Sequence, residues 1–404
     1  MADREAPLPA VLLQRALAYA RNSMVQPTDQ QPLWEGKIKK LDLRLYPSMF
    51  YLQGVLLAIA LAYAVFALLG RALNRWKSRT WLRELENLLQ SEFAVVGKDK
   101  SNPVVWNGGD EACLYASGRR GTACLHASVA LATRHDPAAY AAYGLYDAIM
   151  VPVIPTMPAD RAVLSFVLPP SRPAGTFAVI DKSVLQRVRH GRYDLAFARI
   201  ADAPNFNAQR GLDDRFAVAS EAADITDKWL GDIGARGDAQ RAALGLVGTL
   251  NSAAGAWLES LVWTDQPTKR PSAPVPPSER VERLELTIRL PQSAAAARAA
   301  MPLVATALDI VDALAGAASG RSTLLVLRPE THNTLRRTRA ELDAVLASEA
   351  TADERAEREE AEEQARLNEQ RAKLEKLSPA EQERRKQLEK KRAMRKTQGG
   401  VRMK

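Results

Sequence analysis

The sequence has few cysteines and histidines, and it lacks the short motifs of the common catalytic sites. Only Cys113 and Cys124 occur among 404 residues, which is too few for the disulfide framework of a secreted protein. The four histidines are scattered, and there is no phosphate-binding loop, nucleophile elbow, zinc-protease motif or dinucleotide fingerprint. We therefore expect no active site and no cofactor. An enzyme with an unrecognised site is the alternative.

The two cysteines lie symmetrically about Gly118-Arg119. If the strands on either side form a hairpin, Cys113 and Cys124 could lie opposite each other, as packed thiols in a reducing compartment. Together with His126 they suggest a zinc site, but a structural zinc ion needs four ligands and no fourth is evident nearby. We predict no metal site, and we interpret the glycines and arginines of residues 118–121 as a hairpin turn.

Charged residues are missing from one long segment. Residues 45–70 contain no Asp, Glu, Lys or Arg, and about 20 apolar residues in a helix suffice to cross the hydrocarbon core of a bilayer. Aromatic residues at both ends are typical of membrane interfaces. We predict a transmembrane helix at 49–70. A buried helix of a soluble protein is the alternative, and a signal peptide fits worse because the segment is too long and begins late.

Basic residues flank this segment on both sides. Four precede it within residues 37–44 and five follow it within residues 71–83, so the positive-inside rule favours a cytosolic C-terminal side by one residue. We predict a basic helix at 71–92 whose arginines, spaced four apart, form a stripe along one face. The residues predicted to contact lipid headgroups, or alternatively a charged partner, are Arg71, Arg75, Lys77, Arg79, Arg83, Trp76 and Trp81.

The rest of the chain divides by composition. Residues 1–48 are polar and carry no strong strand signal, so we expect a short, loosely ordered arm. Residues 93–329 alternate short apolar runs of strand character with helical segments, bounded by Gly, Pro and Asp, which predicts an α+β domain. The five prolines of residues 265–279 predict an extended surface loop inside that domain.

Gly and Pro are absent from residues 331–377, and helix formers dominate there. We predict a charged helix at 330–377, stiffened by Glu/Arg pairs. Its apolar stripe degrades to alanines between Val345 and Leu367, so a long homodimeric coiled coil is poorly supported. A second helix and tail, 378–404, begin with the capping pattern of Ser378, Pro379 and Glu381.

The C-terminal end is strongly basic. From Arg384 to Lys404 there are ten Lys or Arg and one acid, a local charge of +9 that equals the formal charge of the whole chain. A nearly neutral protein with one cationic end has a single region suited to phosphates or anionic lipid. The alternative is a solvated helix without a partner. The residues predicted to bind a polyanion are Arg384, Arg385, Lys386, Lys390, Lys391, Arg392, Arg395 and Lys396.

Three patterns carry a resemblance to a known family. They are NRxKxRxWL from Asn74 to Leu82, QSEFxxVG from Gln90 to Gly97, and LSPxEQxxxxxxExxRxMRK from Leu377 to Lys396. In these patterns, and in the order of apolar span, globular domain and charged C-terminal helix, the chain resembles the calumin family. Its members are coiled-coil-domain subunits of the PAT complex at the ER translocon, and the fungal members are the most similar.

The resemblance implies a non-enzymatic ER membrane protein with a lumenal N-terminus, a cytosolic domain and a cytosolic helical extension. It implies a chaperone complex that assists the insertion and folding of multipass membrane proteins. The implied partners are a small Asterix-like membrane subunit, the Sec61 translocon, the ribosome, nascent multipass proteins and the ER bilayer. We find no signal peptide and no long acidic lumenal region, so the calcium binding attributed to that region in animal members is not carried over.

On this interpretation the basic end contacts ribosomal RNA. Contacts with RNA phosphates give affinity without sequence specificity. The alternative function is a single-pass membrane tether or scaffold, whose basic end and arginine stripe both bind anionic lipid surfaces.

Overall fold

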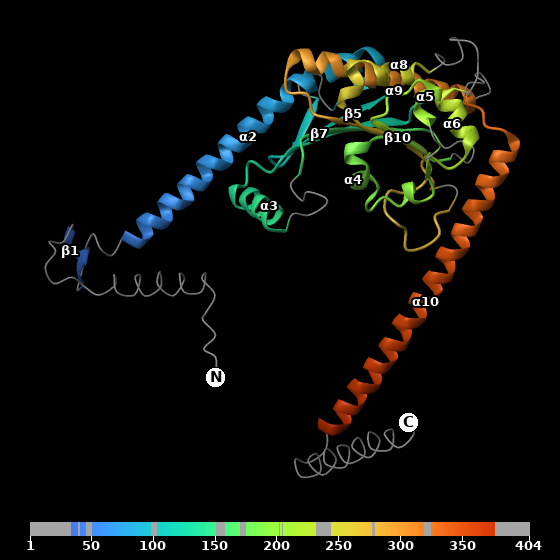
Figure 1. Ribbon diagram of the computed structural model, residues 1–404. Coiled ribbons are helices and arrows are strands. Elements are labelled where there is room, and N and C mark those ends of the chain that lie inside the picture. Colours follow the sequence, from blue (N-terminus) through green and yellow to red (C-terminus); the bar gives the residue numbers. More distant parts are fainter. Residues whose placement is uncertain are drawn as a thin grey trace.

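The computed structural model contains helices and strands from near the N-terminus to residue 375 (Figure 1). It describes residues 34–38, 41–45, 51–97, 103–150, 158–169, 175–201, 203, 205–231, 244–276, 279–318 and 325–375. The expectation of a mixed α and β fold is confirmed. The basic helix and tail predicted at 378–404 lie outside the described residues.

The N-terminal region contains a strand pair that we did not predict. Strand β1 (Trp34–Ile38) pairs antiparallel with β2 (Leu41–Leu45), with Trp34 opposite Leu45 and Ile38 opposite Leu41. Both strands alternate apolar and polar residues, which is the pattern of a half-buried strand. The segment was wrongly interpreted as free of strand signal because its polar residues and prolines dominate the composition around it.

Helix α2 (Tyr51–Glu92) is a single unbroken helix of 42 residues. It contains the predicted membrane span and the predicted basic helix without a break between them. Its first part extends away from the rest of the molecule, and its second part lies against the domain (Figure 1). Buried residues on one face of the helix accordingly begin at Gly70.

The domain is built on one antiparallel sheet of ten strands, in the order β3-β5-β6-β7-β12-β11-β8-β10-β9, with β4 paired to β5. The strands are β3 (Val95–Val96), β4 (Val104–Asn107), β5 (Glu111–Ser117), β6 (Cys124–Ala130), β7 (Arg161–Val167), β8 (Phe177–Asp181), β9 (Arg199–Ile200), β10 (Phe216–Ser220), β11 (Leu258–Thr264) and β12 (Arg283–Arg289).

Strand β11 lies in the middle of the sheet and escaped prediction. All seven of its residues are buried, so the period-2 alternation that marks β7 is missing from it. The proline-rich loop that follows returns directly to β12, the neighbouring strand. The apolar run of residues 194–200 is a strand only at its end, because it forms a short 3-10 turn (Asp194–Ala196) followed by the two-residue β9.

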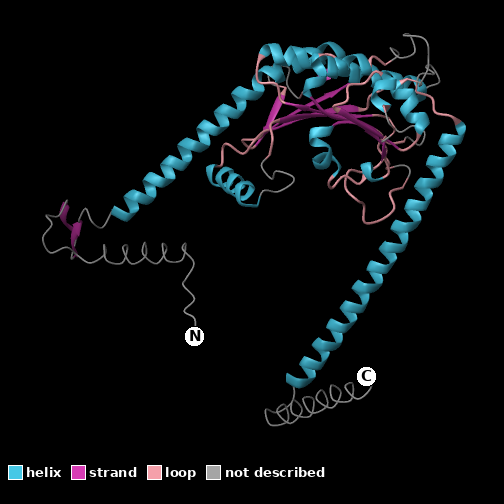
Figure 2. Cartoon of the chain, viewed as in Figure 1, coloured by secondary structure: helices cyan, strands magenta, loops and turns pink. Residues whose placement is uncertain are grey.

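Helices cover the two faces of the sheet unequally (Figure 2). The end of α2 lies on one face together with α8 (Leu246–Asn251) and α9 (Ala294–Ala318), whereas α4 (Leu185–Arg189) lies on the other. Helices α5 (Phe206–Arg210) and α6 (Ala223–Leu230) lie near α8 and α9. Helices α3 (Pro137–Met150) and α10 (Pro329–Glu375) extend away from the sheet.

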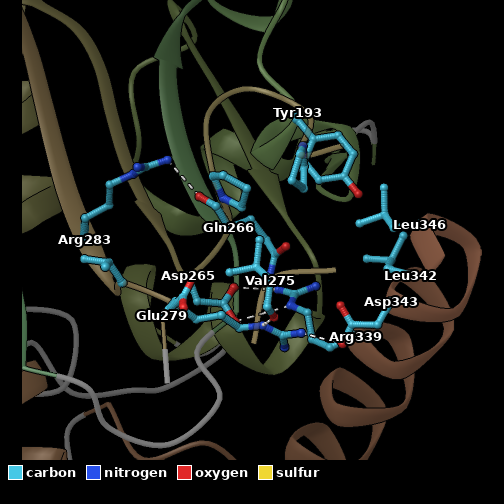
Figure 3. Close-up of a pocket in the computed structure, with 14 residues that line it drawn as sticks. Tyr193, Asp265, Gln266, Val275, Glu279, Arg283, Arg339, Leu342, Asp343 and Leu346 are labelled. Atoms are coloured by element: carbon cyan, nitrogen blue, oxygen red, sulfur yellow. Dashed lines mark hydrogen bonds and ion pairs between the residues drawn. The ribbon is translucent and has the colours of Figure 1, made fainter. Parts of the chain in front are cut away.

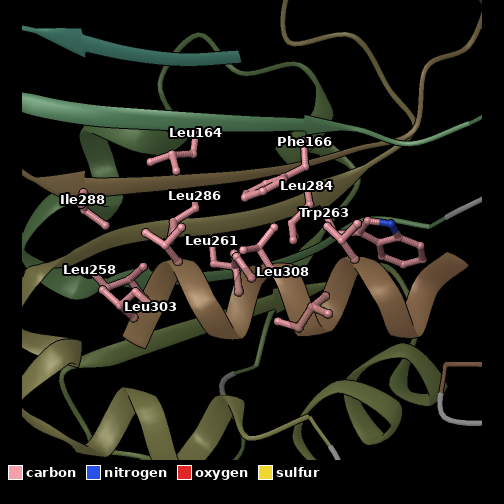
Figure 4. Close-up of a cluster of buried hydrophobic side chains, with 14 of the residues drawn as sticks. Leu164, Phe166, Leu258, Leu261, Trp263, Leu284, Leu286, Ile288, Leu303 and Leu308 are labelled. Carbon is pink, nitrogen blue, oxygen red and sulfur yellow. The ribbon is translucent and has the colours of Figure 1, made fainter. Parts of the chain in front are cut away.

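The main hydrophobic core lies between the sheet and α9 (Figure 4). Leu303 and Leu308 of α9 pack toward Leu286 of β12 and Leu261 of β11. Burying one such leucine contributes about 1.5–3 kcal/mol. The core holds the alanine-rich face of α9 close to the strands, because alanine at positions 297, 300 and 307 leaves little space between helix and sheet.

Two helices of the described residues are long and apolar enough to cross a membrane. In the most apolar window of α2 none of the residues is buried, whereas 56% of those in the corresponding window of α9 are buried. The packing of α9 explains its apolar composition, because α9 covers the sheet. For α2 the protein itself offers no such explanation.

The hairpin β5–β6 forms as predicted, but its cysteines do not face each other. Its connection runs from Gly118 to Ala123, and Gly118 and Gly121 both have φ in the left-handed region. The resulting register places Cys113 opposite Ser128, while Cys124 lies opposite Val167 of β7. The expected opposition is wrong because the turn is centred two residues later than the cysteine spacing suggests.

Candidate membrane and partner interface

The first part of α2 presents a continuous apolar surface. All residues from Tyr51 to Leu69 are exposed except Leu52 and Ala67, which are half-buried. They include large side chains such as Leu57, Ile59 and Phe66. Residues 51–70 form about 30 Å of helix, which matches the thickness of the hydrocarbon core. An exposed apolar surface of this length is stable in lipid and unfavourable in water.

The second part of α2 has two faces. Arg71, Arg75, Arg79 and Arg83 are exposed, so the stripe predicted from their spacing exists on one side of the helix. The guanidinium of Arg75 lies 5.4 Å above the ring of Trp106 of β4. Contact between the four arginines and lipid headgroups remains a prediction.

The two tryptophans of this segment lie in different environments. Trp76 is 67% exposed and is available to an interface, but Trp81 is 0% exposed in the hydrophobic core. The prediction that Trp81 contacts headgroups is therefore wrong. It lies on the face that packs against the sheet together with Leu85 and Leu89, because residues at i, i+4 and i+8 share one side of a helix.

A buried asparagine joins the membrane helix to the domain. Asn74 is fully buried, and its Nδ2 donates hydrogen bonds to the carbonyl oxygens of Gly109 (2.8 Å) and Ala132 (3.0 Å). Its Oδ1 accepts from Nη1 of Arg134 at 3.0 Å. One side chain thus satisfies polar groups of two loops that come from distant parts of the sequence. An aliphatic residue at this position would leave the carbonyl of Gly109 without its donor and would remove one hydrogen bond each from Ala132 and Arg134, which keep other partners.

An ion-pair cluster completes this junction. Arg134 donates to both carboxylate oxygens of Asp160 (2.8 and 2.9 Å), and Nζ of Lys77 lies 3.6 Å from the same carboxylate. The backbone N–H of Ala132 also donates to Asp160. Burial alone would raise the pKa of Asp160, but the hydrogen bonds and charges of these partners hold it below its usual value. Lys77, predicted to contact lipid headgroups, also belongs to this cluster, and its contact with headgroups remains a prediction.

Close backbone contact at Gly70 fixes the helix at the same point. A Cβ at this position would lie 2.1 Å from the carbonyl oxygen of Arg134, so only glycine allows the loop to pass this closely. The sequence change from apolar to basic at Gly70-Arg71 therefore coincides with the point where α2 enters the domain.

A second buried cluster fixes the start of α10 (Figure 3). Leu335, Arg339, Leu342 and Leu346 of α10 lie on one face toward the domain. Arg339 is 3% exposed and pairs with Glu221 (2.7 and 2.8 Å) and Asp265 (2.8 Å). Burial alone would lower the pKa of Arg339, but these two carboxylates raise it above its ordinary value.

Two further ion pairs extend this contact along α10. Arg280 pairs with Asp343 at 2.5 Å, and Arg270 of the proline-rich loop pairs with Glu349 at 2.5 Å. Beyond Glu349 the described side chains of α10 are exposed apart from Ala350. The helix is therefore held at its base and extends freely after that point.

The arginine stripe and the apolar span of this interface are evident in the sequence. Arg134, Asp160 and Arg339 were not predicted. Arg339 has a detectable signal, because it occupies the apolar face formed by Leu335, Leu342 and Leu346. The eight basic residues predicted to bind a polyanion lie outside the described residues.

The candidate zinc ligands do not form a closed site. Cys124 Sγ lies 3.5 Å from His126 Nε2, and both cysteines are free and half-buried. Within the described part of the chain, no group of three or more His, Cys, Asp or Glu residues is arranged to hold a metal ion.

Comparison with known proteins gives two matches. The family model of the PAT complex subunit CCDC47 matches residues 49–396. The chain is also similar to the UPF0674 endoplasmic reticulum membrane protein C2G5.01 of Schizosaccharomyces pombe, with 25% identity over 194 residues. That match covers 46% of this chain and 50% of the yeast protein, so it spans about half the length of this curated relative.

Replacing Asn74 tests the junction. Asn74→Ala leaves the buried carbonyl of Gly109 without its donor and removes the hydrogen bonds to Ala132 and Arg134, which costs about 1–3 kcal/mol. We expect the detergent-solubilised full chain to unfold several degrees lower. The matched control is Asn87→Ala, an exposed asparagine of the same helix, which should leave the melting temperature nearly unchanged. Equal effects of the two substitutions would contradict the assignment of Asn74 as a residue that joins α2 to the domain.

Acid titration tests the Asp160 cluster. Because the folded-state pKa of Asp160 is lowered, its stabilising contribution is present above the unfolded carboxyl pKa of about 3.9 and is lost as pH falls through the folded value. The difference in unfolding free energy between the natural chain and Asp160→Asn should stay constant from about pH 6 to 8 and shrink below about pH 4. A difference that varies already around neutral pH would argue against this cluster.

Removing Arg339 tests the base of α10. Arg339→Met leaves two buried carboxylates without their partner, a change that typically costs about 3–5 kcal/mol. We expect faster amide hydrogen exchange in residues 335–346, whereas Arg336→Met, at an exposed position on the same turn, should leave exchange unchanged. Unaltered exchange in Arg339→Met would mean that the cluster does not hold α10.

Proposed function

Because the chain belongs to the family of the PAT complex subunit CCDC47, we propose that it is a non-enzymatic biogenesis factor of the ER membrane. It acts as a subunit of an intramembrane chaperone complex that joins the ribosome-bound Sec61 translocon. There it assists multipass proteins together with a small Asterix-like subunit. Helix α2 crosses the bilayer once, with the N-terminus in the lumen and the domain in the cytosol.

The observation that carries this proposal is the continuity of α2. Its exposed apolar part and its buried part belong to one helix, and the polar cluster around Asn74 lies one turn beyond the apolar span. The domain is therefore held directly at the membrane surface in a defined orientation. A chaperone beside a translocation channel needs such a fixed position to meet each emerging helix.

Helix α10 extends far beyond the folded domain. After Glu349, the last residue with a described ion pair to the domain, 26 residues of helix remain to Glu375, which extend about 39 Å. The basic residues from Arg384 onward follow this helix in the sequence. A polyanion such as ribosomal RNA can therefore be contacted well away from the folded domain.

The direction of α10 bears on the alternative function. Figure 1 shows α2 and α10 leaving the domain on the same side. A helix this highly charged cannot enter the hydrocarbon core, so α10 cannot follow α2 into the bilayer. This favours a tether that binds anionic lipid as a second candidate. However, residues 349–363 carry eight acids and two arginines. Because anionic lipid repels this negative charge, we favour the ribosome over the lipid surface as the partner of the basic end.

Cosedimentation over a salt series tests the ribosome contact. Changing Arg384, Arg385, Lys386, Lys390, Lys391, Arg392, Arg395 and Lys396 to Gln should weaken ribosome binding at least tenfold and flatten its salt dependence, because fewer phosphates are neutralised. The matched control changes four exposed arginines of α10 to Gln, at positions 336, 337, 358 and 366, and should retain binding. Unchanged binding of the eight-residue variant would refute the contact. Binding to anionic liposomes but not to ribosomes would establish the tether instead.

A further inference from the structure

Helix α3 is apolar, yet none of its residues is buried. Leu145 and Ile149 are 62% and 64% exposed, and Tyr146 and Met150 are also exposed. Asp147 is the only charged residue among the 14. A helix this short is marginal in water on its own, and exposed apolar surface of this kind indicates an interaction site. Something outside the domain is therefore expected to cover α3.

The position of α3 is fixed relative to the membrane helix. The loop before it passes over Gly70 at Arg134, and Asp136, the residue preceding α3, accepts a hydrogen bond from the hydroxyl of Tyr63 at 2.8 Å. Tyr63 lies seven residues before Gly70, about 10 Å along the helix axis toward the lumenal end. The chain therefore descends alongside α2 from the domain to the level of the apolar span before α3 begins.

The residues of α3 divide into two faces. Tyr140, Tyr143 and Asp147 follow the spacing i, i+3, i+7 and share one side of the helix, whereas Ala138, Ala141, Ala142, Leu145 and Ile149 lie on the other. Tyrosine is enriched where a bilayer meets water, because its ring is apolar and its hydroxyl is polar. In the view of Figure 1, α3 also runs across the direction of α2, as a helix in the membrane plane would.

We propose that α3 lies in the interfacial region of the cytosolic leaflet, beside α2. The Leu145 and Ile149 face points toward the acyl chains, and the tyrosine face points toward the headgroups. The occupant of this face is lipid, because the exposed surface of α3 continues that of the apolar span at the same depth. Interfacial helices insert about 5–10 Å below the headgroups, which agrees with the level of Tyr63. This inference rests on the proposed membrane crossing of α2.

A second membrane contact has a mechanical consequence. A single spanning helix leaves the domain free to tilt relative to the bilayer, whereas a second contact beside the helix resists this tilt. Helix α3 thus limits how far the domain can lean away from the membrane surface.

Depth-dependent fluorescence quenching tests the proposal. Single cysteines are introduced at Leu145→Cys, Leu57→Cys or Ala305→Cys into the full chain carrying Cys113→Ser and Cys124→Ser. They are labelled with the environment-sensitive fluorophore NBD, and the protein is reconstituted in phosphatidylcholine vesicles containing lipids spin-labelled along the acyl chain. Ala305 is the matched control, an exposed residue of α9, the helix that packs on the sheet.

We expect spin-labelled lipid to quench the probes at 145 and 57 at least twofold more than the probe at 305, with the quenching at 145 strongest for shallow labels. Aqueous iodide should quench only the probe at 305 efficiently. Quenching at 57 but not at 145 would overturn the inference while leaving the membrane crossing intact, and would assign α3 to a protein partner. Absence of lipid quenching at both positions would overturn the membrane crossing itself.

Discussion

The structure depends on one helix that lies in two different environments. Helix α2 exposes an apolar surface up to Leu69 and buries one face in a protein core from Gly70 onward. The transition is made by Gly70 and Asn74, since the glycine lets a loop approach closely and the asparagine satisfies polar groups of two loops. Because α2 is also unbroken through this point and packs in the core beyond it, the span and the domain form one rigid unit.

Ion pairs fix both ends of the domain, half-buried at α2 and buried at α10. Asp160 with Arg134 and Lys77 holds the membrane helix, and Arg339 with Glu221 and Asp265 holds the base of α10. Buried pairs of this kind add little net stability compared with well-packed apolar residues. They do restrict geometry, because only one arrangement satisfies all the charges. We infer that they serve mainly to set the directions in which α2 and α10 leave the domain.

The sequence predicted elements whose signal is local. The apolar span, the alternating strand β7 and the long charged helix were identified from composition and periodicity. Strand β11 was missed because burial on both faces removes its alternation, and Trp81 was misplaced because an aromatic residue after a membrane span is equally consistent with an interface and with a core. The junction could not be predicted, because Asn74, Arg134 and Asp160 meet only through the pairing of distant strands.

Helix α2 connects bilayer and domain without a hinge. Electron–electron double resonance between nitroxides at Leu61→Cys and Asp214→Cys tests it most directly, in the full chain reconstituted in lipid with Cys113 and Cys124 replaced by serine. These exposed positions lie on the span and on the far part of the domain. A rigid junction predicts a single narrow distance distribution. A broad distribution, or two populations, would contradict the account.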